Sequence, residues 1–362
     1  MSNSVRRVLA FWRSVFWRKA DGGERTAILP LMNIRIGLLA ASRIAEGAVV
    51  EPARSVPGVI VSGIAARDRD RAVAAADRWS IPLVFDSYTE MINSGDIDAV
   101  YVGTPASLHR EWTIAAIEAG KHVLCEKPLA ANAEDAARIA EAAEGADVVV
   151  MEAFHWRYHP LVSQMQSILD AGILGTVEHV DARFEVDASV IPPDDIRWDL
   201  AIGGGAMMDI GCYPASWVRW AIEGEPTVDS AHAVCPVPEI DGSLRAELSW
   251  PSGVTGTIFG SMISDTPGHN ASMEIVGSDA TMLVDNPIAP QNGATLQIRS
   301  SDNLIDIPVL PGSTYVSQLI AFRDAIAFGA PFPTTTRDGV ATMALIDACY
   351  EAAGLVKRPT RG

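Results

Sequence analysis

IRIGLLAASRIA, residues 34–45, is the stretch that decides the fold, because it joins an apolar strand to a short turn and the start of a helix. In open α/β sheets the amide groups of this turn, at the N-terminus of the following helix, hold the diphosphate of a dinucleotide. Ala40 and Ser42 replace the first two glycines of the usual fingerprint, whereas Ala45 is an allowed third member. We therefore expect the backbone of this turn to approach the dinucleotide less closely than a turn with both glycines would. Ser42 would cap the helix or bind a phosphate oxygen. The expected nucleotide contacts in this turn are Ala40, Ser42, Arg43 and Ile44.

Apolar runs and helical patterns alternate from residue 34 to about residue 153, which is typical of βαβ units with a parallel sheet. The expected strands are Ile34–Leu39, Val59–Ile64, Ala99–Gly103, His122–Leu124 and Val148–Met151. The expected helices are Ile44–Val50, Asp70–Trp79, Glu111–Ala119 and Glu134–Ala143. The pattern predicts an N-terminal α/β Rossmann domain with a doubly wound parallel sheet over residues 34–155.

The pattern changes after Pro160 to longer alternating segments, which are typical of an antiparallel sheet. The expected strands are Val177–Val186, Ala246–Trp250, Val254–Ser261, Ser272–Ile275 and Thr295–Ile298. One expected helix, Gly203–Glu223, lies between these strands, and another, Asp338–Gly354, closes the chain. A chain of 362 residues exceeds the usual single core. We therefore predict a second, α+β domain over residues 156–362, with a large, mainly antiparallel open sheet whose uncovered face meets a partner or solvent.

The second strand ends in Ala65-Ala66-Arg67. An enzyme that uses NAD commonly has an acidic residue here for the ribose 2′-hydroxyl, whereas an arginine suits the 2′-phosphate of NADP. Arg67 therefore favours NADP over NAD. The alternative is a surface arginine paired with Asp68 or Asp70.

Composition excludes several classes of protein. The net charge of −17 repels nucleic acid, and no apolar run reaches the length of about 20 residues that a membrane span needs. The four cysteines lack CxxC or histidine spacing, which argues against a zinc site or a disulfide framework and favours a reducing cytoplasm. No metal site is expected.

The first 33 residues differ in character from the rest. Six basic and two acidic residues give them a charge of +4, which leaves −21 for the remainder. Arg6-Arg7 resembles the start of an export signal, but Arg13 and Arg18 interrupt the apolar core that such a signal needs. An amphipathic surface helix is another possibility. We expect a disordered leader or a start assigned too early.

Two later stretches carry residues that handle protons. VLCEKP, residues 123–128, places Lys127 after an apolar run, where the strands of an open α/β sheet end and ligands bind. GGGAMMDIGCYP, residues 203–214, places Asp209 and Tyr213 four residues apart, hence on one face of a helix. The alternative is that Lys127 is a solvated surface lysine and Tyr213 a core aromatic.

Taken together, these features resemble the Gfo/Idh/MocA oxidoreductases over about residues 34–357. The residues that carry the resemblance are the turn at 40–45, Thr104-Pro105 with His109, Glu126-Lys127-Pro128, EAFHWRYHP at 152–160, and Gly203-Gly204-Gly205 with Asp209, Gly211 and Tyr213. The run at 157–160 and Tyr213 resemble the branch with NADP-dependent D-xylose 1-dehydrogenase, dimeric dihydrodiol dehydrogenase and glucose-fructose oxidoreductase.

The resemblance implies roles for these positions. Lys127 and Tyr213 would be catalytic, Asp209 would position the substrate, and the Lys127-Pro128 bond would be cis near the nicotinamide. Further cofactor contacts would come from Thr104, Pro105, His109, Glu126 and Lys127. A homodimer or tetramer assembled through the open sheet face is the family expectation.

Oxidation of an alcohol requires a base for the hydroxyl proton while a hydride leaves for the nicotinamide. A free tyrosine titrates near pH 10, so the Lys127 ammonium would be needed to favour a Tyr213 phenolate. Asp209 would orient a second hydroxyl or the lysine. Arg157 and His159 are candidate substrate contacts, with structural roles as the alternative.

The function expected is an NADP-dependent dehydrogenase, with NAD also open, that acts on an aldose or a vicinal diol. Two alternatives stay open. One is an enzyme that retains its nucleotide and uses it twice, and the other is a nucleotide-binding sensor without catalysis.

Overall fold

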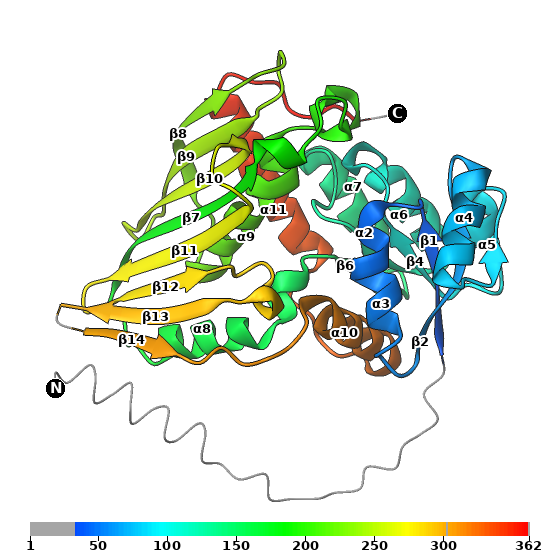
Figure 1. Ribbon diagram of the computed structural model, residues 1–362, viewed down its shortest axis with the longest axis horizontal. Coiled ribbons are helices and arrows are strands. Elements are labelled where there is room, and N and C mark those ends of the chain that lie inside the picture. Colours follow the sequence, from blue (N-terminus) through cyan, green and yellow to red (C-terminus); the bar gives the residue numbers. More distant parts are fainter. Residues whose placement is uncertain (1–32, 302, 361–362) are drawn as a thin grey trace, which may run out of the picture.

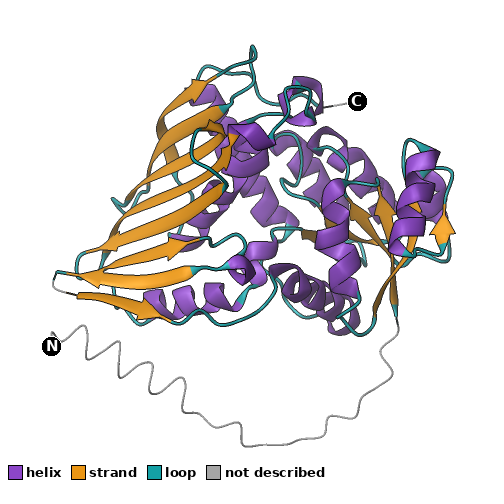
Figure 2. Cartoon of the chain, in the orientation of Figure 1, coloured by secondary structure: helices purple, strands orange, loops and turns teal. Residues whose placement is uncertain are grey.

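The computed structural model describes residues 33–301 and 303–360, and its main features are two β-sheets with helices packed between and around them (Figures 1 and 2). The predicted leader lies almost entirely outside the described residues. The division into domains at residue 155 stays a prediction.

The first sheet has six parallel strands in the order β3-β2-β1-β4-β5-β6. Its strands are β1 (Ile34–Leu39), β2 (Val59–Ala65), β3 (Leu83–Val84), β4 (Ala99–Val102), β5 (His122–Cys125) and β6 (Val150–Glu152). The helices that connect them are α2 (Arg43–Ala45), a π-helical turn (Glu46–Val50), α3 (Glu51–Ala53), α4 (Arg69–Trp79), α5 (Tyr88–Asn93), α6 (His109–Glu118) and α7 (Ala133–Ala143). The strand order reverses between β1 and β4, and in such sheets ligands bind at the carboxyl ends of the strands at this point.

Both faces of this sheet are covered. All four residues of β4 are buried, which explains why its sequence is continuously apolar rather than alternating. A helix from late in the sequence, α10 (Thr314–Phe328), covers part of the sheet, because Leu319 and Phe322 share an apolar cluster with Ile36 and Leu38 of β1.

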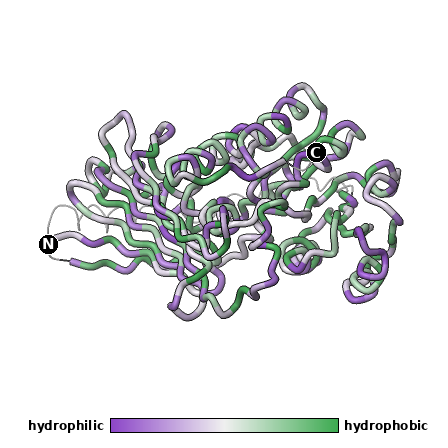
Figure 3. The backbone as a smooth tube through the Cα atoms, turned by 90° about the horizontal axis from the view of Figure 1, so that it is seen from above, coloured by the Kyte–Doolittle hydropathy of each residue, from purple (hydrophilic) through white to green (hydrophobic). Residues whose placement is uncertain are grey.

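The second sheet has eight strands in the order β14-β13-β12-β11-β7-β10-β9-β8, antiparallel except for the β7–β10 pair. They are β7 (Val177–Asp187), β8 (Thr227–Val234), β9 (Ser243–Ser249), β10 (Thr255–Ser264), β11 (His269–Gly277), β12 (Thr281–Asp285), β13 (Thr295–Ser300) and β14 (Asn303–Ile307). Apolar and polar residues alternate along these strands (Figure 3). Helices α8 (Pro160–Asp170), α9 (Cys212–Ala221) and α11 (Thr336–Ala352) lie on the side that faces the first sheet (Figure 1). No helix of the described residues covers the other side (Figure 1).

The predicted fold class is confirmed, with differences in detail. Short or weakly patterned elements were not predicted, namely β3, β8, β12, β14, α5, α8 and α10. The helix expected to begin at Gly203 begins with a π-helical turn, Met207–Gly211, and continues as α9 to Ala221. The three glycines form a turn instead, because Gly203 and Gly205 have φ angles of 86° and 127°, in the left-handed region. None of the helices in the described part of the chain is long and apolar enough to cross a membrane.

Candidate active site

The first turn, residues 40–45, lies at the carboxyl end of β1 and contains polar groups without partners. Ala40 has a φ of 79°, a conformation that glycine adopts without strain, and its N–H donates to the Ala65 carbonyl at 2.9 Å. Ser42 precedes α2 with extended backbone, but its side chain makes no capping bond. Its Oγ is buried and has no hydrogen-bond partner.

The loop after β4 completes a cradle beside this turn. A Cβ at Gly103 would lie 2.9 Å from Ser42 Oγ, so only glycine leaves this space open. Thr104 is 7% exposed, and its Oγ1 is also without a partner. Buried hydroxyls without partners are rare in folded proteins and indicate a missing ligand or water. Two such hydroxyls beside free amides at a helix N-terminus fit the diphosphate of a dinucleotide.

Two arginines lie toward the end of the site where β2 ends. Arg67 is exposed, and its guanidinium has no ion pair or hydrogen bond within residues 33–301 and 303–360. The expected alternative fails, since Asp68 instead caps α4 by accepting from the amides of Asp70 and Arg71. The Arg71 Nη2 donates to the carbonyl of Ala41 at 3.3 Å, which places a second guanidinium against the first turn. Sequence reasoning missed Arg71.

His109 is held by backbone on both sides. It is 1% exposed, with Nδ1 2.9 Å from the Pro128 carbonyl and Nε2 2.8 Å from the Thr104 carbonyl. Both ring nitrogens are therefore occupied by backbone of this chain. His109 joins the loop after β4 to the loop after β5, and its contact with a cofactor stays a prediction.

Glu126 and Lys127 follow β5. Glu126 accepts a hydrogen bond from the Tyr101 hydroxyl at 2.6 Å and another from the Lys127 amide at 3.2 Å. Burial raises the pKa of Glu126. The Lys127-Pro128 peptide bond is cis, as the family resemblance implies.

Lys127, Asp209 and Tyr213 come together as predicted, together with two residues that were not predicted, His155 and Arg197. We call these five residues the lysine corner. The Lys127 side chain is 14% exposed, and its Nζ donates to the Asp209 carbonyl oxygen at 2.5 Å and to the Asp209 Oδ1 at 3.2 Å. It also lies 5.1 Å from the centre of the Tyr213 ring.

Tyr213 is held differently from the expectation. Its hydroxyl lies 3.1 Å from Nε2 of His155, and burial raises the pKa of Tyr213 well above its usual value. The phenolate expected from the nearby ammonium is therefore not favoured in this structure. Burial lowers the pKa of His155 to about 3, so the imidazole is neutral and its Nε2 can accept from the phenol. The other ring nitrogen, Nδ1, is buried without a partner, and the ring packs on Tyr315 with centroids 4.1 Å apart.

Asp209 is shared by two cations. Its Oδ2 accepts from Nε of Arg197 at 2.5 Å, while Oδ1 faces Lys127. Burial raises the pKa of Asp209, but the lowering by Lys127 and Arg197 outweighs this effect. The resulting pKa of Asp209 is about 2. Asp209 is therefore ionised at neutral pH, and one of its two predicted roles, orienting the lysine, matches its contacts.

Arg157 and His159 have structural contacts. The Arg157 guanidinium lies over the Trp156 ring, 5.4 Å from its centre. His159 is 2% exposed, accepts from the Leu161 amide through Nδ1 at 3.0 Å and has Nε2 3.2 Å from the Gly312 carbonyl. His159 thus caps α8, and these contacts match the structural alternative. The substrate role of His159 stays a prediction.

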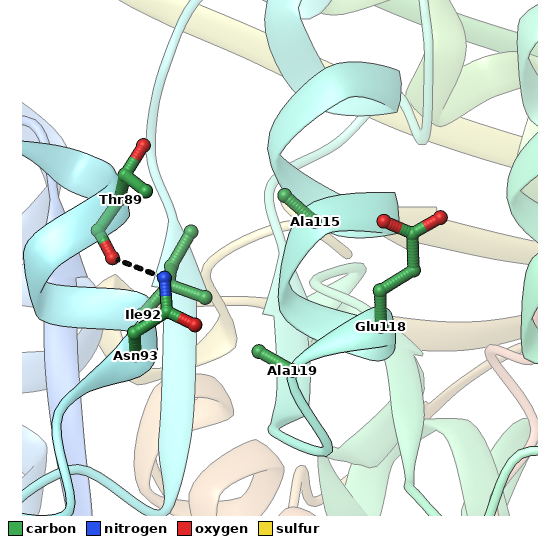
Figure 4. Close-up of a pocket in the computed structure, with 6 residues that line it drawn as sticks. All are labelled: Thr89, Ile92, Asn93, Ala115, Glu118 and Ala119. Atoms are coloured by element: carbon green, nitrogen blue, oxygen red, sulfur yellow. Dashed lines mark hydrogen bonds between the residues drawn. The ribbon is translucent and has the colours of Figure 1, made fainter.

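A surface cavity of about 260 Å³ lies away from these residues (Figure 4). Asn93, Glu118 and Ala119 line it at the C-terminal ends of α5 and α6. The carboxyl ends of the parallel strands lie at the opposite edge of the sheet, where these helices begin. The cavity is therefore not part of the candidate site.

The residues missed by sequence reasoning left only weak signals. His155 lies within the run quoted at 152–160, but nothing in the sequence indicates that its ring meets Tyr213. Tyr315 lies on α10, a helix that was not predicted. Arg197 precedes Asp209 by 12 residues in a segment of short turns without a clear period.

Comparisons with known proteins show the family to which the chain belongs. Residues 34–154 match the model of an oxidoreductase family with an NAD-binding Rossmann fold, and residues 162–283 match the GFO/IDH/MocA C-terminal domain. The chain is 33% identical to an uncharacterized oxidoreductase of Rhizobium meliloti over 332 residues, which cover 88% of this chain and 97% of the relative. It is 32% identical to D-xylose 1-dehydrogenase (NADP(+)) 2 of Haloferax volcanii over 322 residues, which cover 88% and 96%. A crystal structure of a 3-ketoreductase from Actinomadura kijaniata, in complex with NADP and TDP-benzene, superposes with a TM-score of 0.80 at 27% identity, covering 90% of this chain and all of that one.

Proposed function

Because the chain belongs to the Gfo/Idh/MocA oxidoreductase family, we propose that it is an NADP-dependent dehydrogenase that oxidises a hydroxyl group of an aldose or a vicinal diol. The observation that carries this proposal is the convergence of Lys127, Asp209 and Tyr213 at one edge of a nucleotide-binding sheet. The D-xylose dehydrogenase and ketoreductase relatives support the substrate class.

The nucleotide would lie across the ends of β1 and β4. The amides of the first turn, with the hydroxyls of Ser42 and Thr104, would bind its diphosphate, since both hydroxyls lack partners. Arg67, and Arg71 beside Ala41, would bind a 2′-phosphate, because neither a carboxylate nor an ion pair within the described residues occupies the Arg67 guanidinium. We therefore favour NADP over NAD.

The lysine corner would handle the hydroxyl proton. Lys127 has three N–H donors, of which two point at Asp209, so the third can donate to a substrate oxygen. The Tyr213 oxygen would accept a hydrogen bond from the substrate hydroxyl while the phenol donates its own to Nε2 of His155, which is neutral and 3.1 Å away. A bound nicotinamide nucleotide supplies the hydride acceptor. This hydrogen-bonded phenol replaces the phenolate of our sequence-based mechanism.

The direct test is to titrate the protein with NADP⁺ and NAD⁺ while D-xylose, D-glucose and a dihydrodiol are screened for the absorbance of reduced nicotinamide. We expect reduction of NADP⁺ and a clear preference over NAD⁺. Arg67→Ser should lower that preference by about tenfold or more, because it removes a charge-assisted contact to the phosphate. Tight binding without reduction would instead favour a retained nucleotide or a sensor, and equal use of both nucleotides would remove the role given to Arg67.

We further propose a homo-oligomer assembled through the uncovered face of the second sheet. That face carries polar residues and ion pairs, including Arg183 with Asp181 and Arg245 with Glu247. These groups suit either a wet interface or solvent, so a measurement of mass by light scattering decides between a dimer, a tetramer and a monomer. All four cysteines are free, which supports the prediction of a reducing cytoplasm.

A further inference from the structure

Five charged side chains of alternating sign form a chain from the first turn to the lysine corner. Arg43 Nη2 donates to Asp195 Oδ2 at 2.9 Å, and Arg197 Nη1 donates to Asp195 Oδ1 at 2.9 Å. Arg197 Nε then donates to Asp209 Oδ2, whose other carboxylate oxygen accepts from Lys127. This row of charges thus joins residues in the loops of the first sheet to residues between β7 and β8 of the second sheet.

We propose that Arg197, fixed by Asp195, is a positioning residue that holds the Asp209 carboxylate so that it orients Lys127 without capturing its ammonium. The inference rests on the proposed function, because it concerns how Lys127 is made available to a substrate oxygen.

The two oxygens of the Asp209 carboxylate lie at unequal distances from their cationic partners. The contact of Arg197 with Oδ2 is 2.5 Å, whereas that of Lys127 with Oδ1 is 3.2 Å. The carboxylate is therefore held mainly by the guanidinium. Without Arg197, Oδ2 would be free, and the carboxylate could rotate to face Lys127 with both oxygens.

Arg197 is itself firmly placed. The Asp195 side chain is 5% exposed, and its Oδ1 accepts from both the Arg197 amide and Nη1, at 3.1 and 2.9 Å. The Arg197 carbonyl accepts from the Gly205 amide at 3.0 Å, and a Cβ at Gly204 would lie 2.5 Å from that carbonyl oxygen. The glycine turn thus fixes the Arg197 backbone against the start of the segment that carries Asp209. This close approach gives a reason for the second glycine of the triplet.

Electrostatics agree with this geometry. Burial lowers the pKa of Lys127, Asp209 raises it and Arg197 lowers it, and the balance lies above the ordinary value. Loss of Arg197 would leave Asp209 to act on the ammonium alone and would raise the pKa of Lys127 further. The titratable and charged groups around Lys127 are Glu126, Asp209, Arg197, Cys212, Tyr213, His155 and His109.

The test uses the full chain with Arg197→Met, which keeps the apolar stem but removes the charge, and Arg197→Lys. Arg138→Met is the matched control, because Arg138 pairs with Glu141 on the exposed face of α7. Two quantities are measured: kcat with the dissociation constant for NADPH, and the rate at which acetic anhydride labels each lysine. The sequence has four lysines, Lys19, Lys121, Lys127 and Lys357, so mapping by mass spectrometry is straightforward and Lys357 serves as the internal reference.

We expect Arg197→Met to lower kcat by roughly 10- to 100-fold, with the NADPH dissociation constant changed by less than about threefold. Labelling of Lys127 relative to Lys357 should slow by about fivefold, since a tighter ion pair leaves less neutral amine. Arg197→Lys should recover part of both losses, and Arg138→Met should change neither.

Labelling of Lys127 that is unchanged or faster in Arg197→Met, or a kcat within about twofold of the parent, would overturn the proposal. An equal loss of NADPH affinity would overturn it too, because it would assign Arg197 to cofactor binding. If the parent protein oxidises no sugar or diol, the proposed function fails, but the labelling comparison still reports on Arg197.

Discussion

The first turn and the lysine corner lie at the same edge of the molecule, yet they are built in opposite ways. The first turn and its neighbouring loop leave Ser42 Oγ and Thr104 Oγ1 buried without partners. In the lysine corner, by contrast, Lys127, Asp209, Arg197 and the Tyr213 hydroxyl all have partners within this chain.

This contrast separates the part of the site that needs its ligand from the part whose geometry is set in advance. A buried hydroxyl without a partner costs free energy until a ligand or water supplies the bond. In the lysine corner the charged side chains have partners within this chain, and only Nδ1 of His155 is buried without one among the described residues. A charged cluster held in this way keeps its geometry without a ligand, which is what catalysis by positioned groups requires.

The largest expected effect comes from removing the Tyr213 hydroxyl. Tyr213→Phe should lower kcat by about 10³-fold, because it removes the hydroxyl that would bind the reacting substrate oxygen and that His155 holds in place. Binding of NADPH should change by less than about twofold, since the first turn is untouched. Steady-state kinetics and a fluorescence titration measure the two quantities.

Tyr158→Phe is the matched control, because Tyr158 also shares a hydrogen bond through its hydroxyl, with Thr334 Oγ1 at 2.6 Å. It should leave kcat nearly unchanged. If Tyr213→Phe kept kcat within about tenfold, proton transfer would have to be assigned to another group of the corner.

A buried ion pair contacts the segment that carries Asp209 of the lysine corner. Arg358 and Asp241 form this pair with both side chains fully buried, and Arg358 Nε donates to the Gly204 carbonyl at 2.6 Å. Asp241 Oδ2 accepts from the Met207 amide at 2.7 Å, at the start of the segment that carries Asp209.

Arg358→Met should therefore lower the free energy of unfolding by about 3 to 5 kcal/mol, because it leaves a buried carboxylate without its cation. Urea denaturation measures this change. Arg138→Met, at an exposed pair, should cost less than about 1 kcal/mol. Equal effects of the two changes would mean that the C-terminal segment does not support the corner.

The fold was predictable where elements are long and strongly patterned. Strands β1, β2 and β7 and helices α4 and α7 lie within a few residues of their expected positions. Strand β3 has only two residues and α10 is apolar on several sides, so neither gives a clear period. Their positions depend on tertiary packing, such as that of Leu319 against the first sheet.

The sequence indicated the main residues of the candidate site but not which side chains contact each other there. Lys127, Asp209 and Tyr213 were identified, but the partner of the Tyr213 hydroxyl is His155 rather than Lys127. His159 was chosen over His155 although the two lie four residues apart. Which histidine points inward depends on the backbone of the 3₁₀ turn His155–Tyr158, which side-chain spacing alone does not reveal.

His155 gives the corner a dependence on pH that the first turn lacks. The folded protein keeps His155 neutral down to a pKa of about 3, whereas the unfolded chain takes up the proton near its ordinary pKa of about 6.5. A folded-state pKa that is lowered gives stability that is complete above the unfolded pKa and is lost as the pH falls. His155→Gln, which keeps an acceptor for Tyr213 but cannot titrate, removes this contribution.

Between pH 7 and pH 5, the parent should lose about 2 kcal/mol more stability than His155→Gln. The comparison of the two proteins cancels the other histidines. Urea denaturation at several pH values gives the difference, and parallel curves for the two proteins would show that His155 is charged, or reaches solvent, in the folded state.

The smallest expected effect concerns strain in the first turn. Ala40 has a φ of 79°, which costs an alanine about 1 kcal/mol relative to glycine. Ala40→Gly should raise the free energy of unfolding by about 0.5 to 1 kcal/mol. It should also tighten NADPH binding by a few fold, because the backbone could then approach a diphosphate more closely.

Ser80→Gly is the matched control, because Ser80 has a φ of 59° at the end of α4, away from the turn. It should give a similar gain in stability with no change in NADPH affinity. Should the two glycine variants change stability alike and affinity not at all, the departure at Ala40 would be a matter of backbone strain, and the open hydroxyls of Ser42 and Thr104 would carry the recognition of the nucleotide.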